Sequence, residues 1–346
     1  MSEADAGDRG VAGDAPHPRE TSAFFGHAEA EAAMLDSYRG GRVPHAWLIG
    51  GVTGIGKATL AYRFARFALA HPDPAAGPVQ AAHSLALEAD HPIARRVAAQ
   101  GHPDLLVLER TLGDTGKLRS VITVEQVRKT VPFFGSTAGE GGWRIVIVDA
   151  VDELNTEGEN ALLKLLEEPP AKSMLLLVTH RPGRVRATLR SRCRRLSLRP
   201  LAADDVARAA AAALGTTDAQ LRVAARAADG SVARAIALLD GDALKFRERV
   251  DALLARLPEI DARALHALGD AMGGADQTAF EAFIDTLNDW MSTRLRSGPQ
   301  DTAQLARVAE AWQRINRAAA DAEAFNLDRK PVIFEAFGAL AEASRG

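Results

Sequence analysis

The sequence predicts an α/β fold, in which helices cover a parallel sheet, followed by two regions built of helices. Three observations predict it. Continuous runs of Val, Ile and Leu alternate with helical patterns as far as Pro200, which is typical of a parallel sheet buried on both faces. Beyond Pro200 the chain is rich in Ala, and β-branched runs almost disappear. A length of 346 residues also favours more than one domain.

The first domain is expected over residues 23–200, after a tail at residues 1–22. That tail is acidic and rich in Gly, Ala and Pro, a composition that predicts disorder. Helices are expected at 28–39, ending at Gly40-Gly41, and at 57–70. Short apolar runs predict the buried strands. These runs are His45–Ile49, Leu105–Leu108, Arg144–Val148 and Met174–Val178.

Residues 72–103 are interrupted by prolines and are interpreted as an irregular insertion with one short helix. Four histidines lie in or beside it: His71, His83, His91 and His102. Their spacing matches no compact metal-ligand pattern, and three of them precede proline. The chain has a single cysteine, Cys193, which excludes an intrachain disulfide and a cysteine-based zinc site. No metal site is predicted.

A small helical domain is expected over 201–242 and a helical bundle over 243–346. The small domain is predicted to contain helices at 202–214, 218–228 and 230–239, the last with Ser231 as its N-cap. Amphipathic patterns predict the bundle helices. These patterns cover 246–257, 277–296, 302–324 and 331–344.

Charge and hydropathy favour a cytoplasmic protein. The formal net charge of −3 gives no general attraction to nucleic acid. No run of about 18 apolar residues is present, so no transmembrane helix is predicted. The N-terminus lacks the basic start and apolar run of a signal peptide.

The stretch GGVTGIGKATL at residues 50–60 differs by one residue from a phosphate-binding loop, G-x-x-x-x-G-K-[ST]. Its glycines free the backbone to surround phosphate, and Lys57 would reach the β- and γ-phosphates. The hydroxyl that binds Mg²⁺ is missing, because Ala58 occupies that position, and Thr59 is rotated by about 100° along the helix. The candidate nucleotide-binding residues are Gly51, Thr53, Gly54, Gly56, Lys57 and Thr59. ATP is a possible cofactor.

The run RIVIVDAVDE at 144–153 resembles a Walker B strand, with Asp149 as the carboxylate that holds Mg²⁺ indirectly. The next position, where an ATPase of the AAA+ type carries the glutamate that polarises water, is Ala150. Asp152 and Glu153 are interpreted as charges in solvent at the start of a helix. Without a placed base, hydrolysis by this chain would be crippled.

The string NALLKLLEEPP at 160–170 and the triplet Ser191-Arg192-Cys193 resemble the clamp-loader branch of the AAA+ family. That branch includes the γ/τ and δ′ subunits of bacterial DNA polymerase III, and the lost Walker residues are most similar to its δ′ class. The likeness covers about residues 24–240 by motif. Two features depart from the branch: the four-cysteine zinc module is missing, and the sensor-2 arginine, Arg234, falls one position late.

The resemblance implies that Arg192 is an arginine finger directed at the γ-phosphate bound in a neighbouring subunit, with Ser191 and Cys193 positioning its turn. It implies a subunit of the DNA polymerase III holoenzyme, a nucleotidyltransferase assembly, that hydrolyses nothing alone. Its implied partners are the γ/τ and δ subunits, the sliding clamp and, through the complex, primed DNA. The last domain would be the collar that joins subunits, with contact candidates Trp290, Trp312, Phe325 and Phe334.

Three questions stay open at this stage. Direct contact of the arginine-rich segment 180–200 with DNA is one of them. The main alternative function is an active γ/τ-like ATPase that uses Thr59 and Asp149. A more distant one is a P-loop kinase or transferase unrelated to replication.

Overall fold

The computed structural model describes residues 15–113, 118–135, 139, 142–216, 219–239, 241–273, 277–297, 302–325 and 327–345. The chain divides into two compact units, Met1–Ile236 and Ala237–Gly346. The helices that were expected as a separate domain from residue 201 belong, as far as Ile236, to the first unit. Within the described ranges, no helix is both long and apolar enough to cross a membrane.

The first unit is built on a parallel five-stranded sheet with the order β2-β3-β4-β1-β5. Its strands are β1 (Ala46–Gly50), β2 (Leu105–Glu109), β3 (Arg144–Asp149), β4 (Ser173–Thr179) and β5 (Arg194–Ser197). The four strands that apolar runs predicted are confirmed, and β1 and β4 are buried along their whole length. The predicted P-loop type of α/β fold is therefore present.

The fifth strand, β5, lies in the arginine-rich segment 180–200 and was not predicted from the sequence. Its sequence is RRLS, and its residues are exposed or half-buried. It lies at the edge of the sheet, and among the described strands it pairs with β1 alone. An edge strand needs backbone pairing rather than a buried apolar run, so hydrophobicity alone does not reveal it.

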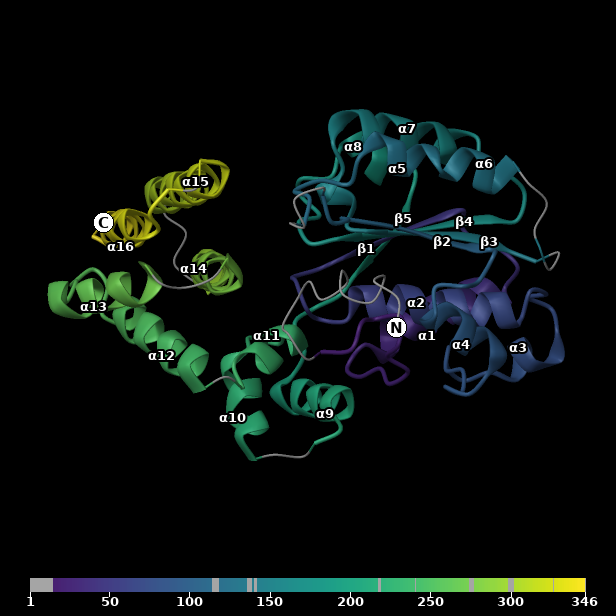
Figure 1. The fold of residues 1–346 in the computed structure, drawn as a ribbon, viewed down its shortest axis with the longest axis horizontal. Coiled ribbons are helices and arrows are strands. Elements are labelled where there is room, and N and C mark those ends of the chain that lie inside the picture. The colour runs from purple at the N-terminus through teal and green to yellow at the C-terminus, as the bar shows by residue number, and fades with distance from the viewer. Residues whose placement is uncertain are drawn as a thin grey trace. The chain divides into compact units, whose positions relative to one another are not determined.

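Helices cover both faces of the sheet (Figure 1). One face carries α1 (Ala28–Arg39), α2 (Lys57–Ala70), α3 (Gly77–Ala81) and α4 (Pro92–Ala98). The other carries α5 (Val124–Arg128), α6 (Thr130–Gly135), α7 (Thr156–Glu167) and α8 (Ala187–Arg190). The bounds predicted for α1 and α2 are confirmed, whereas the insertion at 72–103 contains two short helices, α3 and α4, instead of one.

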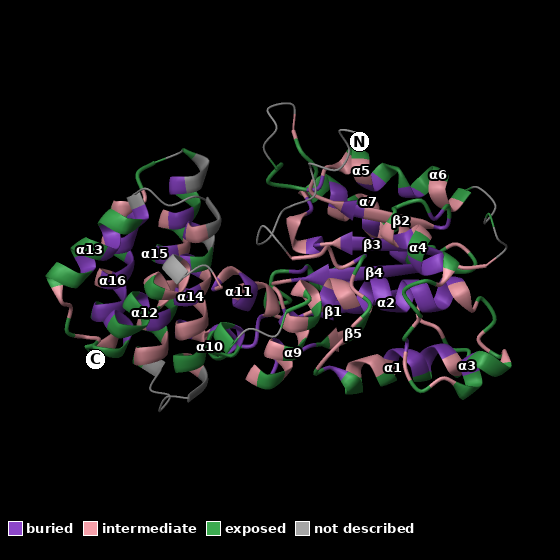
Figure 2. Ribbon diagram, turned by 60° about the horizontal axis from the view of Figure 1, so that its bottom comes forward, coloured by how far each residue is buried: buried purple, intermediate pink, exposed green. Residues whose placement is uncertain are grey.

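Alternate side chains of β3 enter two separate cores. Ile145 and Ile147 pack in the cluster on the α2 face, and Val146 and Val148 pack in the cluster on the α7 face. All four are fully buried, and Figure 2 shows the central strands in the colour of buried residues. This two-sided burial explains why the strand is an unbroken apolar run.

Part of the expected tail is packed instead of disordered. Residues 15–22 lie against α2, where Arg66 donates hydrogen bonds to the carbonyl oxygens of Arg19 and Thr21, at 3.0 and 2.7 Å. The backbone of a polar, proline-rich segment is thus held by buried side chains of the core, which composition does not reveal. The rest of the expected tail, 1–14, lies outside the described residues.

Three helices follow β5: α9 (Ala203–Leu214), α10 (Ala219–Ala227) and α11 (Val232–Ala237). The predicted cap of α11 is confirmed, because Ser231 Oγ accepts a hydrogen bond of 3.2 Å from the Arg234 N–H. The N–H of Leu201 donates to the Gly230 carbonyl at 3.1 Å, which joins the start of this group to its end.

The second unit is a bundle of helices α12 (Gly241–Ala255), α13 (Ala262–Gly273), α14 (Gln277–Ser297), α15 (Thr302–Ala324) and α16 (Lys330–Ser344). The sequence prediction missed α13. Its buried Leu265, Leu268 and Met272 follow helical spacing, so the signal was present. The bundle core includes Phe283 and Phe337, which are at most 2% exposed.

Three of the aromatic contact candidates are packed against this core: Trp290, Trp312 and Phe334 are partly buried on it. The fourth, Phe325, is 71% exposed.

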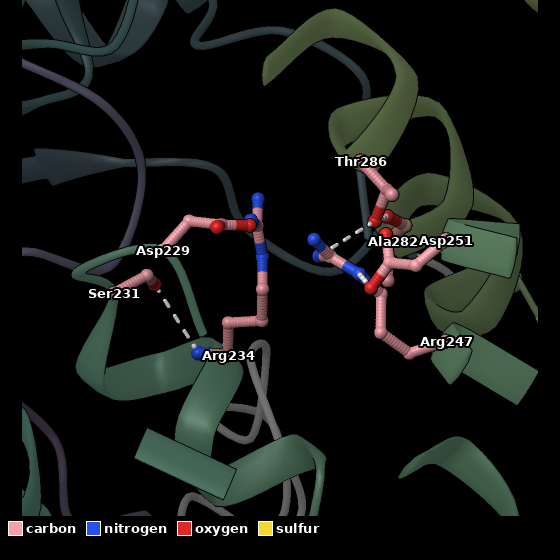
Figure 3. Close-up of polar contacts among 7 residues, drawn as sticks. All are labelled: Asp229, Ser231, Arg234, Arg247, Asp251, Ala282 and Thr286. Carbon is pink, nitrogen blue, oxygen red and sulfur yellow. Dashed lines mark hydrogen bonds and ion pairs between the residues drawn. The ribbon is translucent and has the colours of Figure 1, made fainter. Parts of the chain in front are cut away.

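A polar group also joins two helices of the bundle, α12 and α14 (Figure 3). Arg247 Nε pairs with Asp251 at 2.8 Å, and its Nη1 donates to Thr286 Oγ1 at 3.2 Å.

Candidate nucleotide cavity and arginine site

A cavity of about 540 Å³ opens in the first unit beyond the carboxyl ends of the strands. It is the place where open α/β sheets bind ligands. Most of the predicted nucleotide-binding residues line it: Thr53, Gly54, Gly56, Lys57, Thr59 and Asp149. Gly51 and Arg192 are not among the described residues that line it.

The loop between β1 and α2 has a backbone that favours glycine. Gly54 and Gly56 have φ angles of 76° and 96°, in the left-handed region. The carbonyl of Gly54 accepts a hydrogen bond of 2.8 Å from the Val232 N–H. The carbonyl of Ile55 accepts one of 2.9 Å from His27 Nε2. The loop is therefore fixed from two sides by elements distant in sequence.

Lys57 begins α2 and is 3% exposed. Its Nζ donates to the carbonyl of Val52, within the same loop, at 2.5 Å. Burial lowers the pKa of Lys57 to about 8, and the charges of Asp149 and Asp152 oppose that shift. The ammonium group thus lies in the loop at the point where a phosphate would be received.

Asp149 ends β3 on the cavity. Burial raises the pKa of Asp149 to about 6, although the charge of Lys57 lowers it, and the charge of Glu109 adds to the increase. The adjacent Ala150 is 1% exposed and is packed in the core. The position of the expected catalytic glutamate is therefore filled by a methyl group with no acid–base chemistry.

The interpretation of Asp152 and Glu153 as solvated charges is wrong. Asp152 Oδ1 accepts a hydrogen bond of 3.0 Å from the His180 N–H. Glu153 is partly buried, lines the cavity and pairs with Arg110 Nε at 3.0 Å. Burial raises the pKa of Glu153 to about 7, against the charge of Arg110. The chain bends into a 3₁₀ turn (Val151–Glu153) directly after β3, which turns both carboxylates inward.

Sequence reasoning missed His17, Glu109 and His180, which also line the cavity. Glu109 is the last residue of β2, and His180 directly follows β4. The carboxyl ends of parallel strands meet at one edge of a sheet. Residues at these ends, such as Glu109 and His180, could therefore have been predicted to lie at the same site. His17 carried no such signal, since it lies in the segment assigned to the tail.

The cavity suits a phosphate chain in two respects. The Lys57 ammonium group and the two glycines with left-handed φ angles, Gly54 and Gly56, lie in the loop that borders it. The buried Nδ1 of His180 has no hydrogen-bond partner among the described residues. One feature opposes a magnesium–nucleotide pair, because Ala58 supplies no hydroxyl to the ion. The carboxyl groups of Glu109, Asp149 and Glu153, which line the cavity, are oxygen ligands of the kind that Mg²⁺ prefers. The residues therefore fit a phosphate chain at the loop and a cation at the carboxylates, but they lack the loop hydroxyl of a complete magnesium site.

Arg192 lies just beyond α8, on a surface formed with α7. Its Nη2 pairs with Glu167 Oε1 at 2.8 Å, and its Nη1 donates to the carbonyl of Thr188 at 2.9 Å. The Arg192 side chain is 36% exposed and that of Glu167 is 51% exposed. Cys193, next to it, is half-buried against the α7 core, and burial raises the pKa of its thiol to about 12. This makes the cysteine a packing residue.

Arg234 is turned toward Asp229, with 3.0 Å between Nη1 and Oδ2 (Figure 3). Its neighbours Val232 and Ala233 line the cavity, but Arg234 is not among the described lining residues. The one-residue shift in the sequence thus corresponds to a guanidinium on α11 that pairs with Asp229, just before the same helix.

A family model described as "DNA polymerase III, delta subunit" matches residues 26–202. The chain is 38% identical over 161 residues to a DNA polymerase III subunit delta′ of Pseudomonas aeruginosa, covering 46% of this chain and 45% of that one. It is 32% identical over 222 residues to a subunit delta′ of Escherichia coli, covering 64% and 62%. It is 27% identical over 267 residues to a subunit tau of Salmonella typhimurium, covering 74% and 39%. The chain spans about half the length of these curated relatives.

Proposed function

The chain belongs to the DNA polymerase III delta subunit family, and from this premise we propose that it is a δ′ subunit of a clamp loader. It would join γ/τ and δ subunits and help place the sliding clamp on primed DNA. In that assembly it lends an arginine to the nucleotide site of a neighbouring ATPase and does not hydrolyse ATP itself. The delta′ relatives support the class of the subunit.

The observation that carries the proposal is the contrast between Arg192 and the chain's own cavity. Arg192 is available at the surface, because its pairing with Glu167 is solvent-exposed. Exposed ion pairs contribute about 0–1 kcal/mol, so the guanidinium can exchange this partner for a phosphate at little cost. A guanidinium supplied by a neighbouring subunit stabilises the charge of the transferred phosphoryl group, worth about 10³–10⁵ in rate where such residues act.

The chain's own cavity lacks the groups that hydrolysis requires. Ala58 and Ala150 replace the magnesium-binding hydroxyl and the base, and Arg234 is paired with Asp229. A nucleotide, when bound, would supply only a static phosphate chain to this subunit. Gly54, Gly56 and Lys57 would hold it, and Thr53 and Thr59 would lie beside it. The loop is thus a retained element of the fold.

The experiment measures Mg-ATP hydrolysis by the purified chain alone, and then by the chain with its cognate γ/τ and δ subunits. We expect no turnover alone and stimulated turnover in the complex, lost with Arg192→Ala. Arg184→Ala, in the same arginine-rich segment, is the matched control and should retain the stimulation. Equal stimulation by both variants would contradict the role of Arg192.

The alternative is an active ATPase of the γ/τ type. The match to a subunit tau over 267 residues favours it, as does the presence of both Thr59 and Asp149 on the cavity. It requires turnover by the isolated chain that is abolished by Lys57→Ala. Such turnover would replace the non-hydrolysing proposal.

A further inference from the structure

Residues 15–22, called the N-terminal strap here, run along the candidate nucleotide cavity. They precede α1 in sequence, yet Ala15–Thr21 line the same cavity as Lys57 and Asp149. The strap continues into Phe24 and Phe25, which also line it. One short segment therefore borders the cavity from the carboxylates to the loop.

Two buried arginines of α2 hold the strap by its backbone. Arg66 is 5% exposed and donates to the carbonyls of Arg19 and Thr21. Arg63 is 8% exposed, donates to the Ser22 carbonyl at 2.5 Å and pairs with Glu31 at 2.6 Å. Burying a guanidinium is costly unless its hydrogen bonds are made, so these bonds fix residues 19–22 of the strap against α2.

The far end of the strap carries His17 to the carboxylates. A turn sets the ring, in which the Arg19 N–H donates to His17 Nδ1 at 3.2 Å and the Glu20 N–H donates to the His17 carbonyl at 2.8 Å. The ring lies edge-on to Tyr62, with 5.8 Å between centroids. Its Nε2 is 3.6 Å from Glu109 Oε2. Pro16 and Pro18 on either side restrict the backbone and limit alternative positions.

Glu109 is paired in register with Asp149 across β2 and β3. His17 therefore stands at the two strand ends where a cation bound with a nucleotide would be received. We propose that the strap is a built-in competitor, whose His17 occupies the carboxylate end of the cavity and keeps nucleotide affinity low. The proposal concerns this chain's own cavity and is independent of the role of Arg192.

The test compares two truncations of the full chain. Removal of residues 1–18 deletes His17 but keeps the carbonyls of Arg19, Thr21 and Ser22 that hold the strap to α2. Removal of residues 1–14 is the matched control and leaves the strap complete. Binding of a fluorescent N-methylanthraniloyl ATP, with Mg²⁺, is measured by titration, and thermal unfolding checks that both variants are folded.

We expect the Kd to fall by about fivefold or more in the shorter chain, because residues 15–18, with His17, no longer have to leave the cavity before nucleotide binds. His17→Ala in the full chain should act in the same direction, with His83→Ala as its control. Equal affinities in both pairs would overturn the proposal. So would weaker binding without His17, which would make the strap a wall of the site, or no binding by any variant.

Discussion

The backbone N–H of Val232 donates a hydrogen bond of 2.8 Å to the carbonyl oxygen of Gly54, so the helix α11 is fastened directly to the phosphate-type loop. The two residues are far apart in sequence, and Ser231 and Ala233 leave no room for a side chain at Gly54. The loop therefore also connects the sheet to α11, and this contact restricts its movement.

Gly54→Ala should therefore destabilise the chain by about 2 kcal/mol or more, because the added Cβ would lie 2.3 Å from Ser231 Oγ and φ is 76°. Gly183→Ala is the control, since nothing lies within 4 Å of a Cβ there. Urea unfolding measures both. Equal free energies of unfolding for the two variants would show that the packing of Gly54 against α11 does not contribute to stability.

Arg192→Ala should change the free energy of unfolding by no more than about 0.5 kcal/mol, since its pairing with Glu167 is exposed. Arg63→Ala should cost about 3 kcal/mol, because it leaves the largely buried Glu31 carboxylate without its ion-pair partner. Chemical denaturation of both variants separates the two cases. A large decrease in the free energy of unfolding for Arg192→Ala would contradict this prediction. The loss of ATPase stimulation by this variant in the complex would then reflect unfolding.

The stability of the chain should depend on Glu153 as pH changes. Burial raises the pKa of Glu153 from 4.5 to about 7, so the folded chain binds this proton more tightly than the unfolded chain. The resulting stability is complete below pH 4.5 and is lost as pH rises through about 7.

Glu153→Gln should consequently be more stable than the parent chain at pH 8 by about 1–2 kcal/mol, with the advantage fading toward pH 5. Urea unfolding across this range tests it. Glu168→Gln, at an exposed position, should show no such trend. A parent chain that gains stability relative to Glu153→Gln as pH rises would reverse the sign and contradict the assignment.

Phe337→Ala should cost about 3–5 kcal/mol, because the ring is fully buried in the bundle core. Phe325→Ala should cost less than about 0.5 kcal/mol, since its side chain is 71% exposed. Thermal unfolding of both variants is the measurement. A large effect of Phe325→Ala on the isolated chain would exclude it as a residue kept free for subunit contact.

The sequence by itself determined the class of the fold and most of its helices and strands. Unbroken apolar runs such as RIVIV identify strands buried on both faces, and helical periodicity identifies α1, α2 and the bundle, because these patterns follow from local geometry. The same local patterns placed Lys57 and Asp149 at the ends of elements that lead into one cavity, and they predicted Ser231 as a cap, which the structure confirms.

Only the tertiary structure decided how the remaining polar residues are used. The edge strand β5, the inward turn of Asp152 and Glu153, and the capture of residues 15–22 by Arg63 and Arg66 depend on contacts between distant segments. Composition classes such residues as solvated or disordered, because a polar side chain is buried only when a partner from elsewhere in the chain satisfies it. Such contacts form only in the folded molecule, and those made by Arg63 and Arg66 position the segment that carries His17 beside the cavity.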